Sequence, residues 1–164
     1  MKKITYFIIS FILLVYINAC TGYQPIFGSS NLQFEIADYS IIGNKKLGNQ
    51  IYSKLYSLSK VNKNNANAQS IYISIEVSKG KDVTAKNATG KIIEYRVSLN
   101  TNIIVKNFLT NTIILNQKFI SSSSYTVQDQ HSETIKLENK NIENLLNKTY
   151  QDLLIIMSTN MSTE

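Results

Sequence analysis

Four stretches of the chain alternate apolar and polar residues with the period of two that is typical of half-buried β-strands. The clearest stretch covers residues 93–105, where one face carries Ile93, Tyr95, Val97, Leu99, Thr101, Ile103 and Val105. Similar alternation covers residues 32–42, 71–77 and 113–119. We expect a bulge near Gln117 in the last strand, and a polar loop from Lys79 to Gly90 between the second and third.

Two further stretches carry apolar residues at helical spacing. Residues 44–59 place Leu47, Ile51, Leu55 and Leu58 on one face, and Asn44 suits the N-cap. A longer helix begins near Ser132, with a capping residue and an early carboxylate. Its apolar stripe includes Ile142, Leu145, Leu146, Thr149, Leu153 and Ile156, and its solvated side includes Lys136, Glu138, Lys140 and Glu143. We expect residues 157–164 to be frayed.

The element order is therefore β-α-β-β-β-α. A single helix between the first two strands predicts that they are parallel, whereas short turns between the later strands predict antiparallel pairing. Two helices with one apolar stripe each suit one face of a four-stranded sheet. The pattern thus predicts an α+β fold, a two-layer sandwich of one mixed sheet and two helices on one face. The pattern leaves the strand order open.

The first twenty residues differ from the rest of the chain. Lys2 and Lys3 precede a thirteen-residue apolar run from Ile4 to Tyr16, and the small residue Ala19 comes before the expected cleavage site. This is the pattern of a secretory signal peptide. The run is shorter than the roughly 20 apolar residues that span a bilayer. We therefore divide the chain into a signal peptide (residues 1–19), a tether (residues 20–31) and a single α+β domain (residues 32–164).

Cys20 is the only cysteine, and it directly follows the signal peptide. An aliphatic residue at Ile17 and a small residue at Ala19 before this cysteine match the lipobox of bacterial lipoproteins. Lipidation of the Cys20 thiol would anchor the mature chain to a membrane. The alternatives are a plain signal peptide or an uncleaved anchor with an incidental cysteine. Because residue 21 is Thr rather than Asp, the usual signal for retention in the inner membrane is absent, which favours the outer membrane on its periplasmic side.

The composition offers little for catalysis. The formal net charge is +6, which falls to +4 without Lys2 and Lys3, and His131 is the only histidine. The sequence contains no nucleophile elbow, phosphate-binding loop or spacing of metal ligands. We expect no catalytic residue, no metal and no cofactor, and no binding of nucleic acid, because no recognition motif accompanies the lysines.

Basic residues gather around the expected loop between the second and third strands. They are Lys79, Lys81, Lys86, Lys91 and Arg96, the single arginine of the chain. The simpler interpretation is a solvated hairpin with ordinary lysines. The alternative is a cationic tip that binds phosphate groups, for which arginine offers bidentate contacts.

The start of the mature chain, Cys20-Thr21-Gly22-Tyr23-Gln24-Pro25-Ile26-Phe27-Gly28, resembles that of the LPS-assembly lipoprotein family (LptE) in its alphaproteobacterial form. The element order and the Ser124-Tyr125 link into a long last helix resemble that family too. Thr21 is an extra residue after Cys20, and the last helix lacks an Ala-rich start.

The resemblance implies an outer-membrane lipoprotein that plugs a large β-barrel LPS-assembly protein. Together the two proteins would form the translocon that inserts lipopolysaccharide into the outer leaflet. The resemblance also implies that basic residues bind lipopolysaccharide, here Lys91 and Arg96 with Lys79, Lys81 and Lys86 close by. The alternative function is an accessory lipoprotein of an ABC-type lipid-transport complex, and a periplasmic enzyme is the third class.

Overall fold

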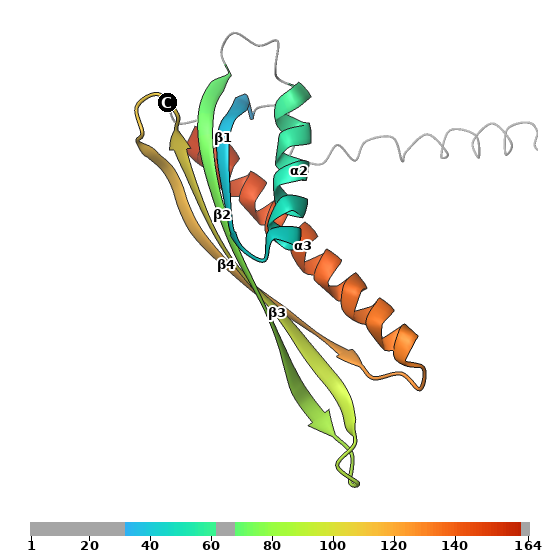
Figure 1. The fold of residues 1–164 in the computed structure, drawn as a ribbon. Coiled ribbons are helices and arrows are strands. Elements are labelled where there is room, and N and C mark those ends of the chain that lie inside the picture. The colour runs from blue at the N-terminus through green and yellow to red at the C-terminus, as the bar shows by residue number, and fades with distance from the viewer. Residues whose placement is uncertain (1–31, 62–67, 162–164) are drawn as a thin grey trace, which may run out of the picture.

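The computed structural model of the chain describes residues 32–61 and 68–161. The predicted signal peptide, the lipidation site Cys20 and the tether lie outside the described residues, as does most of the loop after the first helix. The predicted elements follow one another in the expected order (Figure 1). They are β1 (Phe34–Gly43), α2 (Lys45–Val61), β2 (Gln69–Lys86), β3 (Ile92–Asn107), β4 (Ile113–Thr126) and α3 (His131–Met161).

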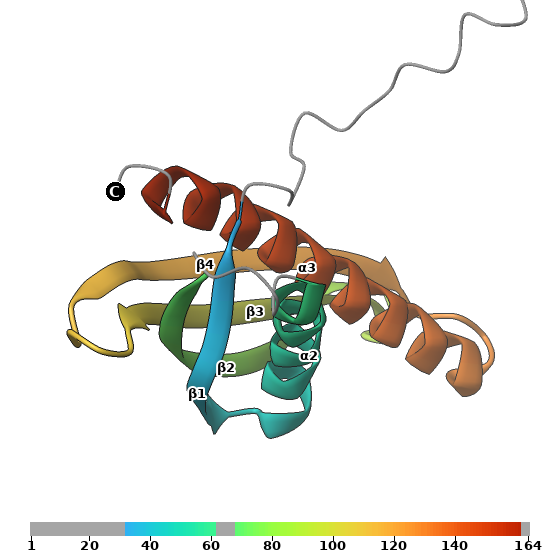
Figure 2. The same cartoon turned by 90° about the horizontal axis from the view of Figure 1, so that it is seen from above.

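The strands form one mixed sheet in the order β1-β2-β3-β4. Strand β1 pairs with β2 in parallel, and the other two pairs are antiparallel, as predicted. Both helices lie on the same face of the sheet, which leaves the other face without a covering layer in the described part of the chain (Figure 2). The α+β two-layer sandwich is confirmed, and the structure adds the strand order.

Local chemistry fixes the connection from β1 to α2. Gly43 adopts a φ of 77°, and a Cβ atom there would lie 2.4 Å from the Val77 carbonyl oxygen. That oxygen accepts a hydrogen bond from the Asn44 amide at 2.7 Å. The Asn44 side chain then accepts one from the Leu47 amide at 3.2 Å, which confirms Asn44 as the N-cap.

The core lies between the sheet and the helices. Alternate side chains of β2 and β3 are fully buried against apolar residues of α2 and α3. The residues buried at the centre of this layer include Phe34, Ile51, Leu55, Ile73, Ile75, Leu99, Ile103 and Leu153. Neither described helix is long and apolar enough to cross a membrane.

Two sequence predictions about element bounds were wrong, and one about a bulge was displaced by three residues. Residues 79–82 are not a loop, because β2 continues through them to Lys86. Helix α3 is not frayed from Met157, which is 1% exposed, and it continues to Met161. The predicted bulge in β4 is present but lies at Ile114 rather than at Gln117, because Val105 pairs with Leu115 and Lys106 pairs with Ile113.

Candidate functional site at the cationic end of the sheet

The extension of β2 brings two of the five predicted basic residues against helix α3. Both ammonium groups contact the Glu138 carboxylate, Lys79 Nζ at 3.0 Å from Oε1 and Lys81 Nζ at 2.6 Å from Oε2. The Tyr125 hydroxyl of β4 donates a third hydrogen bond to Oε2 at 2.8 Å. We call these four residues the Glu138 cluster. It joins β2, β4 and the first third of α3.

Two aromatic rings line the side of the cluster. Lys81 Nζ lies 4.3 Å from the centroid of the Tyr95 ring and 5.7 Å from that of Tyr125. The rings themselves are 6.0 Å apart. An ammonium group over an aromatic face is stabilised by the ring quadrupole. The Lys81 side chain is therefore held by a carboxylate and by two rings, and only 36% of it is exposed.

Three residues of the cluster, Glu138, Lys81 and Tyr125, have shifted pKa values. Burial alone would raise the pKa of Glu138, but hydrogen bonds from Lys81, Lys79 and Tyr125 outweigh it and lower that pKa from 4.5 to about 2. The hydrogen bond to Glu138 is the largest reason why the pKa of Lys81 is raised. Burial is the largest reason why the pKa of Tyr125 is raised. The cluster thus keeps its charges at neutral pH.

The other three basic residues lie elsewhere. Arg96 follows Tyr95 and precedes the fully buried Val97, so its side chain lies on the uncovered face, beside Asp82 and Ser124 of the neighbouring strands. Lys86 ends β2 and Lys91 precedes β3, and both are exposed. Within the described ranges, none of these three residues forms a salt bridge.

The five residues therefore do not form one patch. Lys79 and Lys81 face the helices, Arg96 faces the opposite side, and Lys86 and Lys91 border the turn that connects β2 to β3. This turn projects beyond the start of α3 (Figure 1). We call residues 86–91 the cationic turn. It is organised by Asn87, whose side-chain oxygen accepts hydrogen bonds from the amides of Thr89 at 3.1 Å and Lys91 at 2.9 Å.

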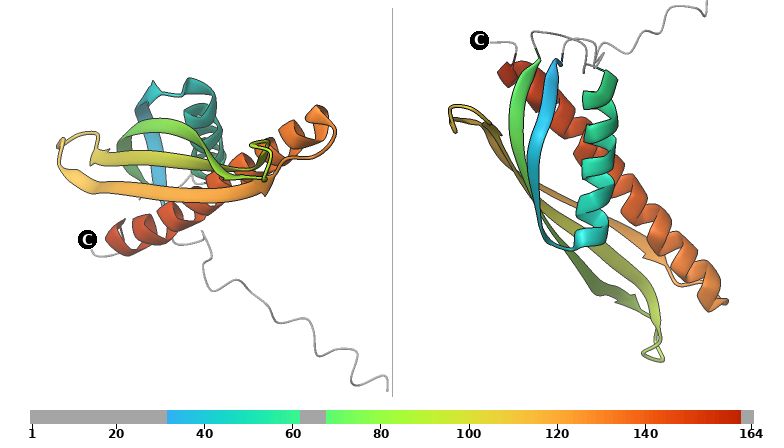
Figure 3. Two further views of the ribbon diagram at one scale, coloured as in Figure 1. Left: turned by 90° about the horizontal axis from the view of Figure 1, so that it is seen from below. Right: turned by 45° about the horizontal axis from the view of Figure 1, so that its top comes forward.

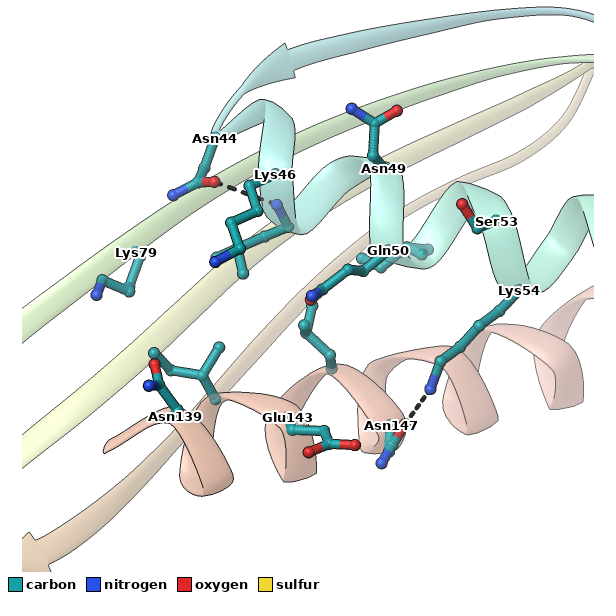
Figure 4. Close-up of a pocket in the computed structure, with 14 residues that line it drawn as sticks. Asn44, Lys46, Asn49, Gln50, Ser53, Lys54, Lys79, Asn139, Glu143 and Asn147 are labelled. Carbon is teal, nitrogen blue, oxygen red and sulfur yellow. Dashed lines mark hydrogen bonds between the residues drawn. The ribbon is translucent and has the colours of Figure 1, made fainter. Parts of the chain in front are cut away.

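A groove of about 660 Å³ separates α2 from α3 (Figure 4). Its floor is apolar, and its walls carry amides and charged groups, including Asn44, Lys46, Gln50, Lys54, Asn139, Glu143 and Asn147. Lys54 donates a hydrogen bond to the Asn147 side chain across the groove. Lys79 lines the groove too, so the groove reaches the Glu138 cluster.

His131 is an exposed residue at the start of α3. In the part of the chain that the structure describes, no three His, Cys, Asp or Glu side chains are grouped to hold a metal ion. The charged groups of the Glu138 cluster are paired with one another, so they are poor proton donors or acceptors near neutral pH.

Sequence reasoning missed Glu138 and the groove. It assigned Glu138 to a solvated side of the last helix, whereas this carboxylate pairs with Lys79 and Lys81 on the inner face of β2. The only available signal was the spacing of Lys79 and Lys81, two positions apart with Gly80 between them, which is the spacing of one strand face. The groove depends on how the two helices lie on the sheet, which no local pattern reports.

No family model matches the chain, and no curated protein matches its sequence. Among solved structures, an uncharacterized lipoprotein B of Nitrosomonas europaea is similar over 87% of this chain and 94% of its own, with a TM-score of 0.61 and 15% identity. A minor lipoprotein of Acinetobacter baumannii is similar over 78% and 95%, with a TM-score of 0.52 and 15% identity. A protein of Caulobacter crescentus CB15 is similar over 83% and 96%, with a TM-score of 0.55 and 11% identity. The described domain therefore has a fold that is found in bacterial lipoproteins.

Proposed function

We propose that this chain is a non-catalytic lipoprotein subunit of the lipopolysaccharide translocon, anchored through Cys20 to the periplasmic side of the outer membrane. The fold carries this proposal. The element order that the resemblance to the LPS-assembly lipoproteins implies is the order in the structure, and lipoprotein B of Nitrosomonas europaea shares it along nearly its whole length. The leader and Cys20 supply the means of anchoring.

The uncovered face of the sheet supports a role as a plug. Many side chains on this outer face are hydroxyls and amides. The helices lie on the opposite side of the sheet (Figure 3). Register places Ser74, Ser78, Ser98, Asn100, Asn102, Ser122 and Ser124 on it. The lumen of an outer-membrane β-barrel is polar. The hydroxyl and amide groups of this face can form hydrogen bonds with a lumen wall.

The cationic end supports contact with lipopolysaccharide. Lys86, Lys91 and Arg96 project without a salt-bridge partner among the described residues, and phosphate oxygens form charge-assisted hydrogen bonds with such groups. Lys79 and Lys81 contribute less, because Glu138 already neutralises part of their charge. We therefore assign the main phosphate contacts to the cationic turn and to Arg96.

Cross-linking followed by affinity purification from native membranes tests the function. The tagged chain should recover a large, heat-resistant outer-membrane β-barrel protein. The control is a fusion of residues 1–31 to an unrelated soluble domain, which should reach the same membrane and recover no barrel. Recovery of an inner-membrane ATPase complex instead would support the ABC-type alternative and overturn the proposal.

A further inference from the structure

The turn between β3 and β4 carries an exposed apolar cluster. Leu109 is 84% exposed, Ile113 is 61% exposed and Phe108 is 49% exposed. No charged residue occurs between Lys106 and Lys118. We call residues 107–113 the apolar turn. Such side chains gain from transfer out of water, and no charge in the turn opposes that transfer.

Four backbone amides of the apolar turn already donate hydrogen bonds within the protein. The Asn107 side-chain oxygen accepts hydrogen bonds from the amides of Leu109 at 2.9 Å and Thr110 at 3.0 Å. The Asn111 amide donates to the Asn107 carbonyl, and the Asn107 amide donates to the Thr112 carbonyl, both at 2.9 Å. These amides would therefore stay paired if the turn entered a medium that lacks hydrogen-bond partners.

The apolar turn lies where the chain enters the domain. The Phe108 amide donates to the Ser70 carbonyl at 2.9 Å, and Ser70 pairs with Glu35 at the start of β1. Leu32 begins the described chain three residues before Glu35. Figure 1 shows the turn and the start of β1 at the same end of the sheet, opposite the cationic turn.

This position limits the distance to the anchor. Cys20 precedes Leu32 by twelve residues, which span at most ~40 Å when fully extended. The cationic turn lies farther away by the length of β3, about 50 Å at the usual rise per strand residue. A tether of this length lets the apolar turn reach the bilayer that holds a lipid at Cys20, whereas the cationic turn lies a further strand length away.

We propose that the apolar turn inserts Phe108 and Leu109 into the surface of the bilayer that holds the Cys20 lipid. This inference rests on the lipid anchor of the proposed function. Lys106, at the base of the turn, would then meet the anionic headgroups of that surface. The contact would place the apolar turn at the periplasmic surface of the outer membrane and direct the cationic turn away from that surface.

Tryptophan fluorescence tests this contact, because the chain contains no tryptophan. The Leu109→Trp variant of the mature lipidated protein is reconstituted into phosphatidylcholine–phosphatidylglycerol vesicles with and without brominated acyl chains. Brominated lipid should remove most of the emission of this variant, and the emission maximum should move to shorter wavelength. The matched control is Val83→Trp near the cationic turn, where a residue 44% exposed should keep its emission.

Vesicle flotation separates failure of this inference from failure of the lipid anchor. If both variants float with the vesicles but Leu109→Trp is not quenched, the apolar turn does not touch lipid and the inference is overturned. Equal quenching of both variants would overturn it as well. If neither variant floats, the anchor itself has failed, and the proposed function fails with it. The Thr110→Trp variant serves as a second reporter should Leu109→Trp not fold.

Discussion

The turns at the two ends of the sheet are held by the same kind of hydrogen bonds, but one turn exposes basic side chains and the other exposes apolar ones. At each end, one asparagine accepts backbone amides into a tight turn, Asn87 between β2 and β3 and Asn107 between β3 and β4. Lys86 and Lys91 flank the first turn, whereas Phe108 and Leu109 project from the second. The asparagines determine that the chain reverses, and the neighbouring side chains determine what each end can bind.

The two ends of the sheet also differ in the charges they carry. The apolar turn contains no charge to neutralise. Near the other end, Glu138 pairs with Lys79 and Lys81, so the unpaired charge lies farther out, at the cationic turn and Arg96. We infer that the Glu138 cluster stabilises the fold, whereas the cationic turn and Arg96 bind lipopolysaccharide. The predictions below test this division.

The largest effect should follow from Glu138→Gln. This change leaves Lys79 and Lys81 without their carboxylate, and we expect a loss of about 2 kcal/mol in the free energy of unfolding, since the pair is only partly exposed. Urea denaturation measures the loss. The control is Glu143→Gln on the same helix, which has no salt bridge in the described chain and should cost little. A similar loss in both variants would contradict the assigned role of Glu138.

The contribution of Glu138 should disappear in acid. Its pKa is about 2 in the folded protein and 4.5 ordinarily, so the stabilisation is complete above about pH 4.5 and is lost as the pH falls towards 2. We therefore expect the stability difference between the unmodified protein and Glu138→Gln to shrink over this range. A difference that stays constant from pH 7 to pH 2 would mean that the ion pairs do not account for it.

Charge reversal at the cationic turn should weaken lipopolysaccharide binding without unfolding the domain. We expect about a tenfold loss of affinity in a Lys86→Glu, Lys91→Glu double variant, which corresponds to roughly 1.4 kcal/mol. Lys45→Glu, Lys118→Glu is the matched control, because it changes the same charge elsewhere, on α2 and β4. Titration with lipopolysaccharide measures both. Equal losses in the two double variants would indicate attraction by net charge alone. Unchanged binding in the Lys91→Glu and Arg96→Glu single variants would refute the hypothesis that these basic residues bind phosphate groups.

The smallest expected loss of stability follows from replacing either turn asparagine with alanine. The loss should be similar for the two variants. Each change leaves two amides without their side-chain acceptor, and we expect a loss of about 1 kcal/mol for Asn87→Ala and for Asn107→Ala. Thermal unfolding compares the two. If only one variant is destabilised, the asparagine does not have the same stabilising role in the two turns, and our comparison of them is wrong.

Much of the fold could be predicted because local pattern and burial agree along most of the chain. The alternation at Ile71, Ile73, Ile75 and Val77 correctly indicated β2, and the spacing from Leu47 to Leu55 correctly indicated α2. Asn44 was identified as a cap from its residue type and position alone. These features depend on neighbours within a few residues, which a sequence displays directly.

The missed features depend on contacts between distant segments. Residues 79–82 looked like a loop because lysines replace the apolar side of the alternation, and their partner Glu138 lies more than fifty positions away. Met157 looked like part of a frayed end because its burial depends on packing outside its own helix. The grouping of basic residues along the sequence did not reveal that the sheet separates Arg96 from Lys79 and Lys81.

The lipid at Cys20 is the assumption on which the membrane contact, the orientation of the two ends and the outer-membrane function all depend. Intact-mass spectrometry of the protein isolated from membranes tests it most directly. We expect a chain that begins at Cys20 and carries the added mass of a diacylglycerol thioether, with or without an amide-linked acyl chain. An unmodified thiol at residue 20, or a chain that retains residues 1–19, would contradict the proposal.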